Sequence, residues 1–171
     1  MASGDSMFAL LPLATIPTAT VPATIDFISD GSAVVGQIPV LDFAGATADE
    51  HAEWDVLVPS HYDDGGLTFE ITYAMDGAVG TDVQFEVRAL KVVAGNAIGT
   101  NDLQGQTATD ITDTPEGTAN VVDVAPTGAI SHANASSPAP GDYLRIRLSR
   151  DYNHAANADD AQVLAVYVTE T

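Results

Sequence analysis

The stretch LTFEITYAM, residues Leu67–Met75, decides the fold class. Every second side chain in it is large and apolar, and Thr68, Glu70 and Thr72 lie between these apolar positions. An alternation with a period of two residues predicts a β-strand that is buried on one face. The preceding residues 63–66, DDGG, have the composition of a turn.

Other parts of the chain show related patterns. Residues 83–89 and 143–149 alternate in the same way, and the run 163–168 is apolar throughout, which predicts a central strand. Asp76, Gly77 and Gly80 separate the first two alternating runs, so we predict that these runs form a hairpin. Weaker strand signals occur at residues 25–28, 38–43, 54–58 and 119–125.

These strands define the predicted fold class. No amphipathic helix is evident, although Ala46–Trp54 has room for one helical turn, and segment 94–118 has the Gly, Thr, Asn and Asp content of a long exposed loop. We predict an all-β, single-domain antiparallel β-sandwich over residues 25–171, for which a jelly roll is one arrangement of the strands.

Residues 1–24 are predicted to form an extended N-terminal arm. Pro12, Pro17 and Pro22 recur at intervals that exclude a helix or a central strand, because proline lacks the amide donor. Large apolar side chains in this arm must dock on the parent domain or on a neighbouring subunit. The interaction arm consists of Met7, Phe8, Leu10, Leu11 and Leu13.

Charge limits the partners. The chain has 24 acidic and 5 basic residues, a formal net charge of -19, so we expect no binding to nucleic acid or to anionic membranes. The apolar run Met7–Leu13 is too short to span a bilayer and no basic residue precedes it. We therefore expect neither a leader nor a membrane segment.

No cluster of residues predicts catalysis, so we expect a protein that is not an enzyme, without catalytic residues or a cofactor. Cysteine is absent, the four histidines lack metal-ligand spacing, and no GxSxG motif occurs. The one place where calcium ligands gather is a loop containing Asp151, Asn153, Asn157, Asp159 and Asp160. Because Asp and Asn favour turns, the pattern does not define a metal site.

Two further groups of residues bear on binding. Arg145 and Arg147 share one face of a predicted strand, so we expect them to pair with carboxylates, either within the subunit or across a subunit contact as interface charges. A glycan-binding site would need exposed aromatic rings. The candidates are Trp54, Tyr62, Tyr143 and Tyr152.

Several weak motifs along the whole chain resemble small structural proteins of tailed bacteriophages. They are FALLP at residues 8–12, PVLDF at 39–43, WDVLVP at 54–59, HYDDGGLT at 61–68, RLSRD at 147–151 and DAQVLAV at 160–166. The resemblance implies a β-sandwich capsid decoration or cement protein on the virion surface, made in the host cytoplasm.

The same resemblance implies binding to a major capsid protein and homo-oligomeric assembly, for which we favour a trimer because such proteins sit at symmetry axes. A glycan-binding β-sandwich module of a phage head fibre or tail is the alternative function.

Overall fold

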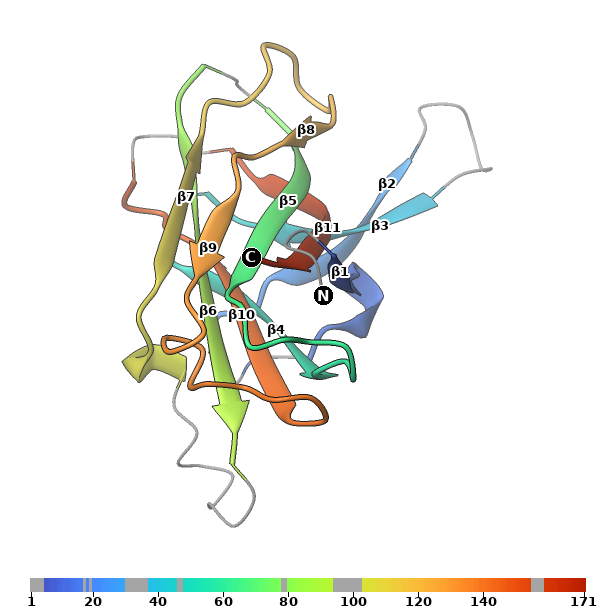
Figure 1. The fold of residues 1–171 in the computed structure, drawn as a ribbon. Coiled ribbons are helices and arrows are strands. Elements are labelled where there is room, and N and C mark those ends of the chain that lie inside the picture. Colours follow the sequence, from blue (N-terminus) through green and yellow to red (C-terminus); the bar gives the residue numbers. More distant parts are fainter. Residues whose placement is uncertain are drawn as a thin grey trace.

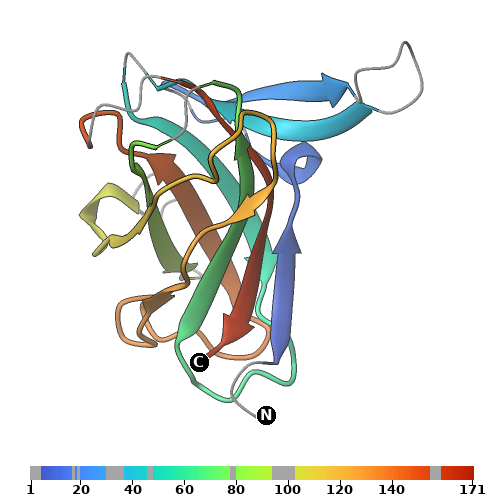
Figure 2. The ribbon, with the colours of Figure 1, turned by 90° about the horizontal axis from the view of Figure 1, so that it is seen from above.

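The computed structural model of the chain is a sandwich of two antiparallel β-sheets (Figures 1 and 2). This confirms the predicted fold class. Among the described residues, no helix has the length and apolar character needed to cross a membrane. The structure describes residues 5–16, 18, 20–29, 37–45, 48–77, 80–93, 103–154 and 159–171.

The first sheet has seven strands and contains both termini of the described chain. Its strands are β1 (Ser6–Leu10), β2 (Thr24–Ser29), β3 (Gln37–Phe43), β5 (Leu67–Met75), β8 (Asp123–Val124), β9 (Gly128–Ile130) and β11 (Ala161–Glu170).

The second sheet has four strands in the order β4-β10-β6-β7. Their bounds are β4 (Glu50–Leu57), β6 (Val83–Val92), β7 (Thr109–Asp113) and β10 (Tyr143–Arg150). Two short 3-10 helices lie in connections, namely η1 (Pro12–Ala14) and η3 (Leu103–Gly105).

Strand β11 is the centre of the first sheet, as its continuous apolar run predicts. It pairs with β5 along one edge and with both β1 and β3 along the other. Strand β3 meets β11 only through Leu41–Phe43, whereas it pairs with β2 from Gln37 to Asp42. The outer half of the β2–β3 hairpin is therefore a two-stranded ribbon that projects beyond the sheet (Figures 1 and 2).

The predicted hairpin between residues 67–75 and 83–89 is wrong, because β5 and β6 belong to different sheets. The alternation shows correctly which side chains face inward, but it does not say which sheet the strand joins. Tyr73 of β5 and Phe85 of β6 meet edge to face across the core, with ring centroids 5.3 Å apart. The connection between these strands thus crosses from one sheet to the other.

Two local predictions also need correction. Residues 50–54, where one helical turn had room, belong to strand β4. Segment 94–118 is not one exposed loop: residues 94–102 lie outside the described part, but η3 and β7 follow, and Leu103 and Ile111 are buried. Strand β7 was missed because its sequence, TDITD, contains a single large apolar residue.

The segment assigned to the N-terminal arm contains strand β1, which pairs with β11. Leu10 is buried in the core, and Met7 and Phe8 pack against it. Leu11 and Leu13 are exposed. Beyond η1 the chain passes along the edge of β4, where Ile16 and Pro22 form isolated bridges. This segment therefore contributes to the first sheet and also borders the second.

Candidate functional site

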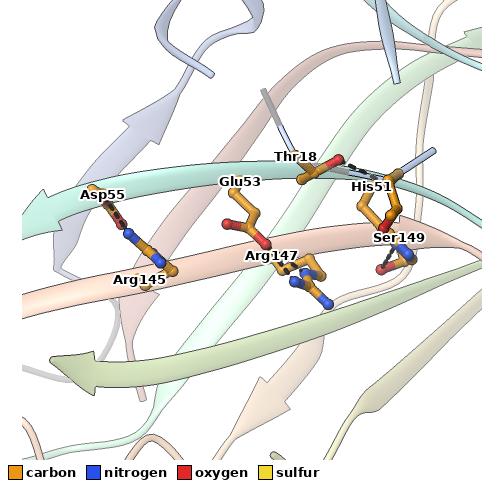
Figure 3. Close-up of polar contacts among 8 residues, drawn as sticks. Thr18, His51, Glu53, Asp55, Arg145, Arg147 and Ser149 are labelled. Atoms are coloured by element: carbon orange, nitrogen blue, oxygen red, sulfur yellow. Dashed lines mark hydrogen bonds and ion pairs between the residues drawn. The ribbon is translucent and has the colours of Figure 1, made fainter. Parts of the chain in front are cut away.

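The outward face of the four-stranded sheet gathers most of the basic residues of the chain. Because side chains alternate along a strand, the positions that flank the buried residues of β4, β6 and β10 all point away from the core. We call this surface the arginine face (Figure 3). It includes His51, Glu53, Asp55 and Leu57 of β4, Glu86, Arg88, Leu90 and Val92 of β6, and Tyr143, Arg145, Arg147 and Ser149 of β10.

Arg145 and Asp55 form a bidentate ion pair on this face. They are register partners, and the Arg145 Nε and Nη2 atoms donate to the two carboxylate oxygens of Asp55 at 2.8 and 2.9 Å. The hydrogen bond to Asp55 raises the pKa of Arg145. Desolvation, followed by a hydrogen bond to Asp55, raises the pKa of Tyr143. Three side chains are thus held in one network on two rigid strands.

Arg147 forms the second ion pair, with its register partner Glu53. On β6, Arg88 pairs with Glu86 at 2.9 Å, and Arg88 lies directly opposite Arg147. The enclosed Arg147 Nη1 and Arg88 Nε atoms have no hydrogen-bond partner among the described residues. Two like charges on neighbouring strands are therefore balanced by carboxylates on either side of them.

His51 and Ser149 continue the row on β4 and β10. The His51 Nδ1 atom lies 2.9 Å from the Ser149 hydroxyl. Burial, and then the positive charge of Arg147, lowers the pKa of His51, so the imidazole is neutral near pH 7. Figure 3 shows the three pairs in line, from Asp55–Arg145 to His51–Ser149.

The end of the arginine face away from His51 and Ser149 is exposed and partly apolar. Tyr143 is 42% exposed, and its register partner Leu57 is 65% exposed. An aromatic ring stands here beside the carboxylate of Asp55 and the guanidinium of Arg145. This arrangement offers a ring face for stacking together with hydrogen-bonding groups in fixed positions.

Both predicted interface arginines are paired within the chain. Arg145 and Arg147 do share a face, and both pair with acidic residues of the neighbouring strand within the same chain. The residues that complete the site, Asp55 and Glu53, were not identified from the sequence. Their pairing depends on the register between β4 and β10, which are about 90 residues apart in the chain.

The four aromatic candidates separate into two groups. Trp54 and Tyr62 are in the core, and the Trp54 indole donates to the Leu11 carbonyl at 3.0 Å. Tyr143 and Tyr152 are exposed. The alternation of side chains in β10 predicts that Tyr143 points outward. For Trp54 the sequence makes no such prediction, because the bounds of β4 are needed to show that Trp54 occupies an inward position.

The calcium candidates do not converge in the described part of the chain. Asp151 accepts the Asn153 amide in a turn, whereas Asp160 accepts the Gly45 amide and donates its own amide to Asp76. Asn157 lies outside the described residues. No group of three or more acidic or histidine side chains suited to a metal ion occurs among the described residues.

Comparison with known proteins gives structural likeness only. No protein-family model matches the chain, and no curated protein matches it. The Cry4Aa toxin from Bacillus thuringiensis aligns over 96% of this chain with a TM-score of 0.56 and 9% identity. This chain spans only 23% of the toxin chain.

Two carbohydrate-binding modules align over nearly the full length of both chains. The CBM6cm-2 module of Cellvibrio mixtus lichenase 5A, solved with cellotriose, has a TM-score of 0.52 and 13% identity, and the alignment covers 98% of this chain and 99% of the module. The C-terminal CBM6 of LamC from Zobellia galactanivorans has a TM-score of 0.50 and 12% identity, with coverage of 96% and 99%. At these identities the likeness establishes the shared β-sandwich fold.

Proposed function

We propose that this chain is a non-catalytic carbohydrate-binding module. The observation that carries the proposal is that the chain and two such modules align along nearly their entire lengths, so the whole sandwich corresponds to a complete module. A module that only binds needs no catalytic group, which agrees with the absence of a catalytic motif from the sequence.

The Tyr143 end of the arginine face is the binding site in this proposal. A sugar ring presents C–H groups on its faces and hydroxyl groups around its rim. Tyr143 and Leu57 supply apolar surface, whereas Asp55 and Arg145 supply acceptors and donors beside it. The ligand is a neutral oligosaccharide, because the guanidinium charges on this face are already paired and the chain as a whole would repel a polyanion.

Titration calorimetry against neutral oligosaccharides, beginning with cellotriose, tests this proposal. Tyr143→Ala should weaken binding at least about tenfold, the range for loss of one stacked ring and its contacts. Tyr167→Ala is the matched control, since Tyr167 is 44% exposed but lies on β11 in the other sheet. Equal losses in the two variants, or no binding to any neutral glycan, would contradict the proposal.

A structural role on a virion surface is the second candidate function. The observation that favours it is the exposed apolar surface of Leu11, Leu13 and the β2–β3 ribbon, which suits attachment to a larger assembly. In this alternative, the protein would copurify with phage particles at a fixed copy number. Mass spectrometry of gradient-purified virions checks this prediction. Absence of the protein from the purified particles would contradict a structural role, whether or not the protein binds a neutral glycan.

A further inference from the structure

The strands of the β2–β3 ribbon carry no basic residue and two acidic ones, Asp26 and, at the base of the ribbon, Asp42. From Ser6 to Leu41 the charged residues are Asp26 and Asp30, and none is basic, while the chain as a whole carries a formal charge of -19. The ribbon also exposes large apolar side chains: Ile25 is 44% exposed, Phe27 46% and Ile38 51%. Two copies of so acidic a chain repel one another less where surfaces with few charges meet than where their strongly charged faces meet.

The open edge of the ribbon is strand β2. Among the described residues, β2 pairs with β3 along one side and ends the strand order of its sheet. The Phe27 amide donates to the carboxylate of Asp26 at 2.7 Å, and the residue opposite Phe27 is Pro39, which has no amide. Phe27 therefore directs its backbone donor away from β3, toward the open edge.

The outward direction of the Phe27 backbone groups fixes the direction of the backbone groups of its neighbours in β2. If the backbone groups of Phe27 point outward, those of Ile25 and Ser29 do too, because outward and inward groups alternate along a strand. In a two-fold antiparallel pair the facing residues must lie on the same side of the sheet, so Phe27 can face Phe27 of a second copy while Ile25 faces Ser29. Asp26 then faces Ile28 rather than another Asp26.

We propose that this surface is a homodimer interface in which β2 pairs antiparallel with β2 of a second copy, centred on Phe27. The two seven-stranded sheets would become continuous across the two-fold axis. The aromatic side chains at the axis form a cross-strand pair, which is favourable in antiparallel sheets. The Asp26 carboxylate releases the Phe27 amide to the carbonyl of the second copy, so one acceptor replaces another.

Sedimentation equilibrium of the full chain tests the association. We expect a species of twice 17.7 kDa whose dissociation constant falls about tenfold or more as salt rises from about 0.1 to about 1 M, since salt screens the repulsion between copies. Phe27→Asp should abolish it, while Tyr167→Asp, which adds the same charge elsewhere on the same sheet, should not. A monomer at every salt concentration would overturn the proposal and would indicate that Asp26 prevents pairing at the edge of β2. A trimer would also overturn the proposal.

Cysteine cross-linking tests the register. The chain has no cysteine, so Phe27→Cys introduces a single thiol. A hydrogen-bonded antiparallel pair has Cα atoms about 5.5 Å apart, within the span of a disulfide. Phe27→Cys should therefore form a covalent dimer under mild oxidation by oxidised glutathione. Ile25→Cys is the control, on the same strand face and equally exposed but not opposite itself; equal cross-linking of the two variants, or none in Phe27→Cys, would overturn the register.

Discussion

The arginine face and the β2–β3 ribbon are both outward surfaces of one sandwich, yet they are built in opposite ways. The arginine face lies on a four-stranded sheet, and its charges are paired across β4 and β10, as in Arg145–Asp55 and Arg147–Glu53. The ribbon has two strands, two charged side chains in its described part, Asp26 and Asp42, and exposed Ile25 and Phe27.

This difference indicates two kinds of contact. Charged groups fixed on rigid strands and held beside an exposed ring suit a polar ligand with directional hydrogen bonds. Exposed apolar side chains on an open edge suit another protein chain, because such surface is stabilised by area and backbone pairing. Each surface can be altered without touching the other, so their separate contributions to stability and association can be measured.

The largest effect on stability is expected in the N-terminal strand β1, which pairs with β11 and places Leu10 in the core. Leu10→Ala should lower the free energy of unfolding by about 3 kcal/mol, because Leu10 is 3% exposed and its loss leaves a cavity. Leu13→Ala, at a side chain that is 64% exposed, should change it by less than about 0.5 kcal/mol. Urea unfolding measures both values. Equal effects in the two variants would mean that β1 is an arm without a place in the core.

A smaller loss is expected on the arginine face. Arg147→Gln removes the partner of Glu53, which is 9% exposed, and should cost about 2 kcal/mol because a nearly buried carboxylate loses its compensating charge. The double variant Glu53→Gln with Arg147→Gln should recover part of this loss, since neither charge then remains alone. Chemical unfolding at pH 7 measures the coupling, and simple additivity of the two substitutions would contradict it.

The smallest effect concerns Asp42, at the point where the ribbon joins the sheet. Burial, and then the charges of Asp160 and Asp76, raises the pKa of Asp42 to about 6. Among the residues that the structure describes, the enclosed Asp42 Oδ1 atom has no hydrogen-bond partner, and neither has Oε1 of its register partner Gln162.

Because the folded-state pKa of Asp42 lies above the unfolded value of 3.8, the folded state binds the proton more tightly. The resulting stability is present below about pH 3.8 and is lost as pH rises through about 6. Asp42→Asn should therefore raise stability at pH 8 by up to about 1 kcal/mol, after allowance for solvent screening. Thermal melts across this pH range check this, and a gain that is the same at pH 5 and pH 8 would argue against it.

The sequence predicts the strands whose side chains alternate cleanly, because burial on one face imposes that pattern. Residues 67–75 became β5 with the same bounds. Strand β1 was assigned to an arm because the prolines that follow it dominate the local pattern. The sequence also could not predict to which sheet a strand belongs, because β5 and β6 have the same periodicity although they face the core from opposite sides.

The same distinction applies to the candidate site. That Arg145 and Arg147 share a face follows from the two-residue repeat of one strand. Their partners on β4 do not follow from it, because the register of β4 against β10 is fixed by the packing of the whole sheet. The ribbon was predicted as two weak strands, but its projection beyond β11 becomes evident only when the short pairing of β3 is known.

The central claim is that the Tyr143 end of the arginine face binds a neutral glycan. Titration of isotope-labelled protein with cellotriose and related neutral oligosaccharides, followed through backbone amide chemical shifts, tests it most directly. We predict that the largest changes occur in β4 and β10 around Leu57, Asp55, Tyr143 and Arg145, and that the amides of the β2–β3 ribbon stay unchanged. Saturable changes centred on any other surface, or no changes with any neutral glycan, would contradict the claim.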